Sequence, residues 1–520
     1  MKNLYISSLL LSLPLSLLAA DNPAQPAKAN TPLEKDIYNF HLQHPGGGSS
    51  PGDPNAAFYL DGVYHMHYII QHPWNDITSY SFVHVTSPDM LHWTWQKTTL
   101  QPSFSGHGMF SGTGFLTKEG VPAAIYHGYQ GKGGGGRNQI ALAKDHALSA
   151  WEKPFPMEFR NADGSPAKFR DWDPDCFLIG DTYYAYSGGQ EQPLFKSKDL
   201  HDWTHIGPFL KHNMPDVAYG EDISCGNFFR IGNKWMLLCI SHPVGCRYYL
   251  GDWDAKAEQF VPEKHGRMNW RREDQPIYQI LRRDDFFAPE SVLTPDGRRV
   301  MWAWLASIGV PGDVDKVNYQ TIQSLPRELS LPEDGILRIK PLHELEGLRE
   351  EPQSLSEIKI SEITKEVLPN KAPAGTKVVT LPGDSVELRV TIAREQAERK
   401  LFGFTLFSDG KGAGLTILFR PETGTIRVGT TEAPFKVSDL PAGEDISLRV
   451  FIDKNLVEVF VNDRQAVVSS VADTQGLTDL SAFTVGKSTT LKQLEIWKLK
   501  PTNQGFREAQ TNRVWEPDTK

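Results

Sequence analysis

The sequence predicts an all-β protein, with a five-bladed β-propeller followed by a C-terminal β-sandwich. Two observations support this. A strand–turn–strand unit recurs five times in the first part of the chain, and short alternating strands divided by Gly, Asp and Pro turns fill much of the rest. Helical periodicity is hardly visible between the five units, and 520 residues are enough for two or more domains.

The recurring unit is a short apolar strand, a glycine turn and a second strand of alternating aromatic or apolar residues. Its five copies turn at Gly62, Gly120, Gly180, Gly232 and Gly297, which is the pattern of a β-hairpin. Five radially arranged four-stranded sheets would close a propeller, in which the first strand of each unit lines a central channel. A single sandwich is the alternative, but it would not need this recurrence.

The propeller is expected over residues 37–340. Beyond it the sequence becomes charged and then strand-like again. The other predicted segments are a signal peptide at 1–20, an N-terminal linker at 21–36, a charged linker with a helix at 341–355, the sandwich at 356–500, and a polar, loosely held tail at 501–520.

The first twenty residues have the pattern of a secretory signal. Lys2 precedes an apolar run that ends in Ala19 and Ala20. We therefore expect a secreted or periplasmic protein, with a membrane anchor as the alternative. No later segment is long and apolar enough to span a bilayer.

Charge and cysteine content exclude some classes of function. A net charge of −9 argues against a nucleic-acid partner, because nucleic-acid binding needs a basic surface. The four cysteines, Cys176, Cys225, Cys239 and Cys246, lack the paired short spacings of a zinc site. A disulfide and buried thiols are both open alternatives. The sequence does not indicate an oligomeric state.

Acidic residues stand at the start of four of the five first strands. They are Asp53, Asp173, Glu221 and Glu290, whereas the second unit, "FSGTGFL", has none. If the first strands converge on one channel mouth, these carboxylates face each other. Two or three convergent carboxylates suit the cleavage of a glycosidic bond. The alternative is that they cap turns or pair with cations, for which Arg170, Arg230 and His72 are the candidates.

The stretch "FRDWDPDCF" holds three acids at alternate positions, which strand parity cannot separate. Asp173 is favoured for catalysis, because a proline follows it as one follows Asp53, and proline restricts the preceding residue to extended conformations. Asp175 has no acidic counterpart in the first unit, where Asn55 stands, so we expect a structural role. Asp171 remains the alternative to Asp173.

Seven segments occur in the order found in a known family. They are "GDPNAAFYLDGVYHMHYIIQHPW", "MFSGTG", "WDPDCF", "GEDISCGNFF", "FFAPESVLTPDGRRVMWAWL", "LPRELSL" and "LRVFIDKNLVEVFVNDRQAV". From about His41 to Lys500, the chain resembles glycoside hydrolase family 32, the β-fructosidases, which include invertases, inulinases and levanases.

The resemblance implies a retaining hydrolase of β-fructofuranosyl linkages in fructans or sucrose, acting through a covalent fructosyl-enzyme. It implies that Asp53 is the nucleophile, Asp173 the transition-state stabiliser and Glu221 the acid/base, with no metal or organic cofactor. The substrate-binding residues that it implies are Asn55, Gln71, Trp74, Phe110, Ser111, Arg170, Asp171 and Trp172.

The chain departs from the family pattern at several positions. Ser-Pro-Gly precedes Asp53 where the family usually has Trp-Met-Asn, and Ala56 replaces a glycine. Trp172 replaces the arginine of the family's Arg-Asp-Pro segment. Asp222 replaces the cysteine after the acid/base, where it would either raise the proton affinity of Glu221 or point to solvent.

Three other functions remain open at this point. They are a fructosyltransferase of the same fold, a five-bladed arabinan- or xylan-active hydrolase, and a carbohydrate-binding protein without turnover. The "FSG" element and the predicted sandwich favour fructan, and the presence of all three acids argues against a binding protein. Linkage preference and exo or endo action are not indicated.

Overall fold

Strands dominate the chain, as the sequence predicts. The computed structural model describes residues 36–46, 49–130, 136–214, 222–242, 245–271, 286–305, 321–364, 371–399, 401–471, 473–474 and 476–520. Its helical segments are short: α1 (Pro102–Ser105), α3 (Arg394–Ala397), α4 (Gln504–Asn512), and the 3-10 turns η2 (His343–Leu348) and η3 (Val437–Asp439). Within these ranges no helix is both long and apolar enough to cross a membrane.

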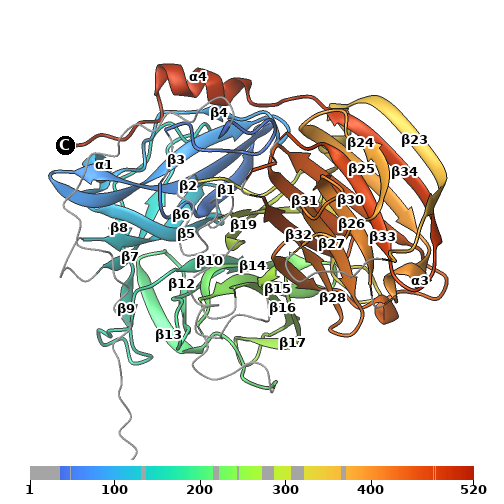
Figure 1. Ribbon diagram of the computed structural model, residues 1–520. Helices are drawn as coiled ribbons and strands as arrows, with labels where there is room; N and C mark the ends of the chain where they lie inside the picture. The colour runs from blue at the N-terminus through green and yellow to red at the C-terminus, as the bar shows by residue number, and fades with distance from the viewer. Residues whose placement is uncertain are drawn as a thin grey trace, which may run out of the picture.

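Five antiparallel sheets follow one another along residues 54–341, and we call them the five-sheet unit (Figure 1). Sheet 1 is β1 (Pro54–Leu60), β2 (Val63–Trp74), β3 (Ile77–Ser87) and β4 (Thr94–Trp95). Sheet 2 is β5 (Gly108–Leu116), β6 (Pro122–Tyr129), β7 (Arg137–Leu142) and β8 (Phe155–Pro156). Sheet 3 is β10 (Asp175–Ile179), β11 (Thr182–Tyr186), β12 (Pro193–Ser197) and β13 (Asp202–Pro208), with β9 (Glu158–Arg160) added parallel to β13.

Sheets 4 and 5 have the same order. Sheet 4 is β14 (Ser224–Ile231), β15 (Lys234–Ser241), β16 (Gly245–Asp254) and β17 (Gln259–Arg267). Sheet 5 is β19 (Phe287–Leu293), β20 (Arg299–Trp304), β21 (Arg327–Ser330) and β22 (Arg338–Pro341). The five predicted hairpins are confirmed: each of their turn glycines has a positive φ, between 55° and 88°, a conformation that glycine adopts without steric cost.

The first strands of the five sheets meet at the middle of this unit. β1 contacts β5, β5 contacts β10, β10 contacts β14, β14 contacts β19, and β19 contacts β1 again. In Figure 1 these five strands lie around one centre. Residues at the starts of these strands are therefore brought together although they are far apart in the chain.

Two further sheets pack face to face and form the two-sheet unit. One has the order β23 (Arg349–Ile360), β34 (Thr489–Leu499), β25 (Ser385–Ile392), β30 (Ile446–Asp453), β31 (Leu456–Val461) and β32 (Gln465–Ser470). The other has the order β18 (Trp270–Arg271), β29 (Thr431–Pro434), β28 (Thr425–Val428), β27 (Leu415–Arg420), β26 (Phe402–Ser408), β33 (Asp479–Thr484) and β24 (Thr376–Thr380). Their alternating apolar residues share one buried cluster.

The predicted linker at 341–355 is shorter than expected. The 3-10 turn η2 takes the place of the predicted helix, and β23 begins at Arg349. β23 pairs with β34 along its length, so these residues already belong to the two-sheet unit. The exposed, charged side chains of "REEPQSLSE" conceal this strand in the sequence, because it lies at an edge of its sheet.

The prediction of a loosely held tail is wrong. α4 contacts β4 of sheet 1, and Trp515 beyond it is only 3% exposed. The Thr98 hydroxyl donates to the Trp515 carbonyl at 2.5 Å, and the Asp518 amide donates to the Gln101 side chain at 2.8 Å. A few buried apolar side chains hold this mostly polar segment against the five-sheet unit. The amino-acid composition of the segment does not reveal them.

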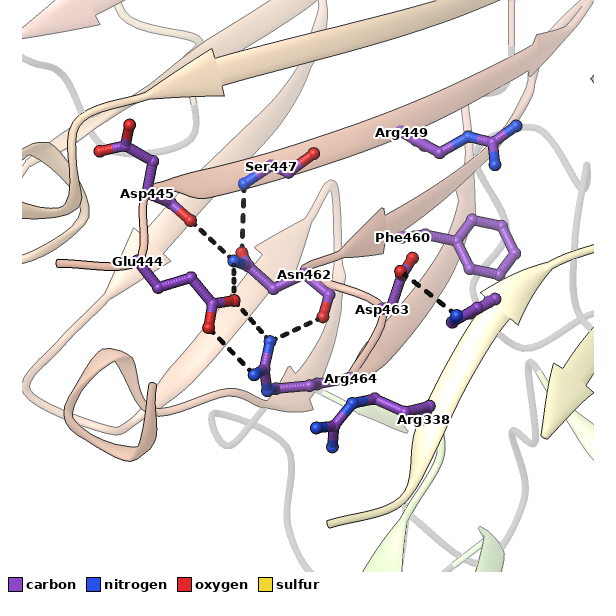
Figure 2. Close-up of a pocket in the computed structure, with 10 residues that line it drawn as sticks. Arg338, Glu444, Asp445, Ser447, Arg449, Phe460, Asn462, Asp463 and Arg464 are labelled. Carbon is purple, nitrogen blue, oxygen red and sulfur yellow. Dashed lines mark hydrogen bonds and ion pairs between the residues drawn. The ribbon is translucent and has the colours of Figure 1, made fainter. Parts of the chain in front are cut away.

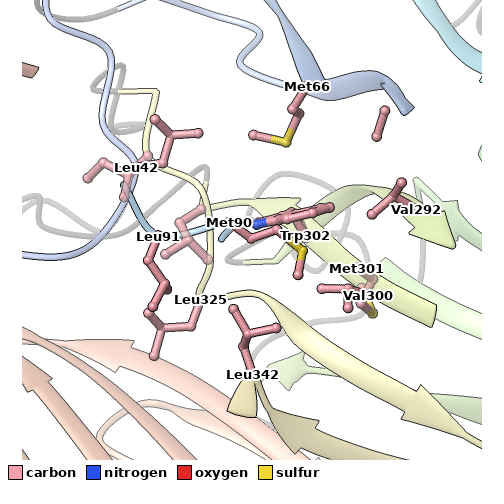
Figure 3. Packing of buried hydrophobic residues seen from close by; sticks show 14 of the residues in the cluster. Leu42, Met66, Met90, Leu91, Val292, Val300, Met301, Trp302, Leu325 and Leu342 are labelled. Carbon is pink, nitrogen blue, oxygen red and sulfur yellow. The ribbon is translucent and has the colours of Figure 1, made fainter. Parts of the chain in front are cut away.

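One apolar core joins several parts of the molecule. Leu42 from the N-terminal segment, Met66 from β2, Met90 from the loop between β3 and β4, and Trp302 from β20 pack together (Figure 3). The same cluster continues to Phe451 and other side chains of the two-sheet unit. The two units are thus held together by continuous hydrophobic burial, whose contribution grows with the apolar area removed from water.

A buried polar cluster lies beside this core, where His41 is held between two carboxylates. Its Nδ1 lies 2.9 Å from Asp453 and its Nε2 lies 3.3 Å from Glu458, and none of the three side chains is exposed. Arg327 of β21 donates to the second oxygen of Glu458 at 2.8 Å. This cluster therefore connects the N-terminal segment, sheet 5 and the two-sheet unit.

Candidate active site

Irregularities at matching places shape the centre of the five-sheet unit. β1, β5, β14 and β19 each carry a β-bulge near the start of the strand. In three of them the bulge includes a non-glycine residue with positive φ, namely Ala56 at 39°, Cys225 at 45° and Ala288 at 49°. Bulges turn side chains out of the regular alternation and are frequent beside active sites.

Asp53 precedes β1 and is held rigidly by its backbone. Its carbonyl accepts hydrogen bonds from the Ile69 amide at 2.9 Å and from the Asn55 side chain at 2.7 Å. One carboxylate oxygen, Oδ2, accepts from the Ser111 hydroxyl at 3.2 Å. The other, Oδ1, is buried and has no hydrogen-bond partner within the described residues. Burial, and next the charge of Asp173, raise the pKa of Asp53 to about 7.

Asp173 precedes β10 and has a strained backbone, with φ at 25°. Its Oδ2 accepts from the Cys225 amide at 3.3 Å, and the Cys225 thiol lies 3.6 Å from the same oxygen. Its Oδ1, like that of Asp53, is buried without a hydrogen-bond partner in the described chain. Burial raises the pKa of Asp173 as well.

Ser111 and Cys225 connect the two carboxylates. The Cys225 sulfur lies 3.9 Å from the Ser111 hydroxyl, which in turn donates to Asp53. Asp53 and Asp173 are therefore close neighbours at the centre of the five sheets, each with one oxygen that no described protein group uses. Two such carboxylates can stabilise positive charge on a sugar ring, and one can attack its anomeric carbon.

Glu221, the predicted acid/base, lies outside the described residues. Its neighbour Asp222 is described, and its side chain is 17% exposed. Asp222 does not point to solvent, because one of its oxygens lies 2.5 Å from His242 Nδ1 and accepts from the His242 amide at 3.0 Å. Ser224 donates to the other oxygen. The alternative that Asp222 points to solvent is therefore wrong.

His242 is a site residue that sequence reasoning missed. When protonated, it lowers the pKa of both Asp53 and Asp173, against the larger effect of burial. His242 directly follows β15, and a search of the ends of the second strands, as well as the starts of the first strands, would have found it.

The aromatic candidates lie on one side of the site. Phe110 and Trp172 have ring centroids 6.2 Å apart, and Arg170 stacks on Trp172 at 5.1 Å. Phe110 also packs edge-on against Tyr80, and the exposed Gln71 donates to the Tyr80 hydroxyl at 3.4 Å. Phe110 and Trp172 are only half-buried, so both rings have surface available for a ligand.

Of three other predicted residues, Asn55 and Asp171 have hydrogen-bond partners in the protein. Asn55 accepts from the Gly112 amide at 2.7 Å and so joins β1 to β5. Asp171 accepts from the Asn138 amide at 2.8 Å, and burial raises its pKa to about 6. Trp74, half-buried at the end of β2, has an indole nitrogen that makes no hydrogen bond within the described residues.

Asp175 and Glu290 hold neighbouring first strands together. Asp175 accepts from the Phe228 amide at 2.8 Å, which joins β10 to β14. Glu290 accepts from Thr113 at 3.1 Å and from Asn227 at 3.2 Å, which joins β19 to β5 and β14. Burial raises the pKa of Asp175 to about 7 and that of Glu290 to about 8. These contacts favour the structural role predicted for Asp175.

The other suggested partners lie elsewhere. His72 contacts Ser81 and its own neighbour Pro73, and Arg230 stacks on Trp235. No group of three or more potential metal ligands is found among the described residues. Nor does a disulfide join any of the four cysteines, all of which belong to the described part of the chain.

A separate pocket of about 320 Å³ lies between β22 and the two-sheet unit (Figure 2). Several of its polar and charged groups bond one another. Arg464 makes two hydrogen bonds to Glu444, and Asn462 donates to Glu444 and to the Asp445 carbonyl. In contrast to the central site, this pocket is an ion-paired contact surface between the two units.

Known proteins match nearly the whole of this chain. The profile described as "Glycosyl hydrolases family 32 N-terminal domain" matches residues 48–341, and "Glycosyl hydrolases family 32 C terminal" matches residues 344–498. The chain belongs to glycosyl hydrolase family 32. It is therefore a glycoside hydrolase, and the resemblance inferred from the seven motifs is confirmed.

Relatives agree with this family. Raffinose invertase of Escherichia coli is 28% identical over 461 residues, covering 83% of this chain and 88% of that protein. Among solved structures, sucrose-6-phosphate hydrolase from Lactobacillus gasseri has a TM-score of 0.68 at 19% identity, covering 90% of this chain and 94% of that one. Fructan 1-exohydrolase IIa from Cichorium intybus has a TM-score of 0.67 at 17% identity, covering 90% and 98%.

The structure shows the surroundings of two residues that depart from the family 32 pattern. Ala56 occupies a positive-φ position that suits the family's glycine. Gly52, before Asp53, has no room for a side chain, because a Cβ there would lie 2.7 Å from atoms of both Thr321 and Trp304. The indole of Trp304 therefore fills the space beside the Asp53 backbone.

Proposed function

We propose that this family 32 hydrolase cleaves β-fructofuranosyl linkages of sucrose-type or fructan substrates, with retention of configuration. The observation that supports this most is the pair Asp53 and Asp173, side by side at the centre of the five sheets, each with one buried oxygen lacking a described protein partner. The names of the relatives, raffinose invertase and fructan 1-exohydrolase, point to the same linkage. We also propose that the five sheets are the blades of a propeller and the two-sheet unit its companion sandwich.

In the proposed reaction, Asp53 attacks the anomeric carbon of the fructosyl group. The bond to the leaving oxygen breaks as the bond to Asp53 forms, and the leaving oxygen takes a proton from the acid/base. Water then attacks the fructosyl-enzyme, returns a proton to the acid/base and releases Asp53. The resemblance assigns the acid/base to Glu221, and this assignment stays a prediction.

The electrostatics of the pair suit such a transition state. Asp53 and Asp173 are buried close together, so each opposes the ionisation of the other. A sugar ring that develops positive charge between them relieves this repulsion, whereas a neutral ring does not. The interaction is thus stronger in the transition state than in the ground state, which is the requirement for catalysis.

Phe110 and Trp172 are proposed as the sugar platform beside these carboxylates. Both rings are half-buried, and their centroids lie 6.2 Å apart with the ring planes tilted by 43°. Arg170, stacked on Trp172, is an exposed donor for sugar hydroxyls. Gln71 and Trp74 are proposed as further contacts, on sheet 1.

The proposal includes export from the cytoplasm, because the first residues have the pattern of a signal peptide. Residues 1–20 lie outside the described residues. Mass spectrometry of the protein recovered from the medium or periplasm should find an N-terminus near residue 21, whereas an intact N-terminus on cytoplasmic protein would contradict export.

A product profile tests the function. The purified protein is incubated with sucrose, sucrose 6-phosphate, raffinose, levan and inulin, and with arabinan as a negative control. We expect release of fructose or fructo-oligosaccharides, with the β-anomer formed first by NMR. Longer fructosides from concentrated sucrose would indicate a transferase, and activity on arabinan alone would refute the proposal.

Matched variants test the carboxylates. Asp53→Asn and Asp173→Asn should each lower kcat by orders of magnitude while circular dichroism stays unchanged. Asp171→Asn is the control, because Asp171 contacts the Asn138 backbone. Loss of turnover in Asp171→Asn with near-normal activity in Asp173→Asn would show that the stabiliser was wrongly chosen.

A further inference from the structure

The strand register identifies equivalent residues in the sheets, starting with the place of Asp53 in sheet 1. Asn55 pairs with His67 on β2, and the bulge of β1 follows directly, before Phe58 pairs again. Asp53 stands two residues before Asn55, and its backbone carbonyl accepts a hydrogen bond from the Ile69 amide, two residues beyond His67.

Sheet 4 repeats this register. Ser224 pairs with Ile240 on β15, and the bulge of β14 follows directly, before Asn227 pairs again. Asp222 stands two residues before Ser224, and its carboxylate, in place of the backbone carbonyl that Asp53 uses, accepts a hydrogen bond from the amide of His242, two residues beyond Ile240. Asp222 in sheet 4 is therefore the counterpart of Asp53 in sheet 1.

Asp222 also lies within electrostatic range of Asp173. Its negative charge is one of the causes that raise the pKa of Asp173, after burial, and this requires a short separation within the site. Its side chain is largely buried and fully engaged, since Ser224 holds one oxygen and His242 the other. Asp222 is thus a positioned group at the site, not a surface acid.

His242 completes the arrangement. Its ring packs edge-on against Phe287 of sheet 5, with centroids 5.7 Å apart, while its Nδ1 bonds Asp222. When protonated, it lowers the pKa of both Asp53 and Asp173. An imidazole hydrogen-bonded to a carboxylate can hold one transferable proton between the two groups, and a retaining mechanism needs such a proton for its leaving group.

We propose that Asp222 and His242 together carry the proton that passes to the leaving oxygen. This inference rests on the proposed function and differs from the assignment to Glu221. In the first step the bond from the anomeric carbon to the leaving oxygen breaks, the bond to Asp53 forms, and the pair gives its proton to the leaving oxygen. In the second step the oxygen of a water molecule bonds to the anomeric carbon as the bond to Asp53 breaks, and a proton of that water returns to the pair.

The test compares substrates that do and do not need an acid. Asp222→Asn, His242→Asn and Glu221→Gln are assayed on sucrose and on 4-nitrophenyl β-fructofuranoside, whose leaving group departs without protonation. We expect Asp222→Asn and His242→Asn to lose about 10²- to 10⁴-fold in kcat/KM on sucrose and less than about tenfold on the nitrophenyl substrate. His92→Asn, at an exposed ion pair with Asp89, is the control.

Azide distinguishes a lost proton carrier from a distorted site. With the nitrophenyl substrate, added azide should accelerate Asp222→Asn and yield β-fructosyl azide, because azide needs no base to attack the fructosyl-enzyme. His242→Asn keeps an amide donor near the position of Nδ1 but cannot carry the proton. Wild-type activity in this variant would show that His242 only positions Asp222 and would overturn the shared role.

Failure of this inference is separable from failure of the proposed function. If wild-type protein cleaves sucrose and only Glu221→Gln shows the leaving-group dependence and azide rescue, the pair is not the proton carrier while the function stands. If the wild type cleaves no β-fructoside, the function itself is wrong.

Discussion

Replacing His41 should remove a part of the protein's stability that depends on pH. The imidazole lies between Asp453 and Glu458, fully buried. Burial alone would lower its pKa, but hydrogen bonds to these two carboxylates, and their charges, raise it from 6.5 to about 9. The ring is therefore expected to be an imidazolium in the folded protein at neutral pH.

The magnitude follows from this shift. A rise from 6.5 to about 9 corresponds to about 3 kcal/mol, at about 1.4 kcal/mol for each pKa unit. Because the folded-state pKa is the higher one, this stabilisation is fully present below about pH 6.5 and is lost as the pH rises through about 9.

The assay is urea unfolding of the wild type and His41→Asn at pH 6 and pH 10. The stability difference between the two proteins should be larger at pH 6, by about 3 kcal/mol. His146→Asn, at an exposed ion pair with Asp61, is the matched control and should show no such change. An equal difference between wild type and His41→Asn at both pH values would refute a buried imidazolium at this position.

Three further predictions concern the site and the tail. kcat/KM should fall on the acid side with an apparent pKa near 7, because protonated Asp53 cannot attack, and an acid limb below pH 5 would contradict this. Trp172→Ala should raise KM several-fold with kcat little changed, as measured by initial rates, and an unchanged KM would remove Trp172 from the sugar platform. Trp515→Ala should cost about 3–5 kcal/mol in urea unfolding, because a buried indole is lost. A decrease in the free energy of unfolding of less than about 0.5 kcal/mol would indicate that the tail is loosely held after all.

Local patterns account for what the sequence predicted well. A two-residue alternation and a glycine turn define a hairpin within about fifteen residues, and all five turn glycines do have positive φ. The seven ordered motifs likewise sufficed for the family. Edge strands were harder, because β23 presents charged side chains on both faces and reads as a linker.

The carboxylates show what local sequence patterns cannot decide. Proline after Asp53 and Asp173 predicted two side chains directed by an extended backbone. The structure places both carboxylates at one centre, but the expected extended conformation is wrong for Asp173, whose φ is 25°. The choice between Asp173 and Asp171 is not visible in the sequence, since both lie on the same face of an extended chain. It depends on Cys225 and Ser111, which come from other sheets.

The sequence by itself determined the strand pattern, the family and a short list of acids, because each of these depends on neighbouring residues. Only the tertiary structure decided which groups meet. The ring of first strands brings Asp53 to Asp173 and places His242 beside Asp222, and the buried contacts of His41 and Trp515 join segments more than four hundred residues apart. Such long-range contacts form when the free energy gained by burial outweighs the entropy cost of closing the chain, and no local pattern records them.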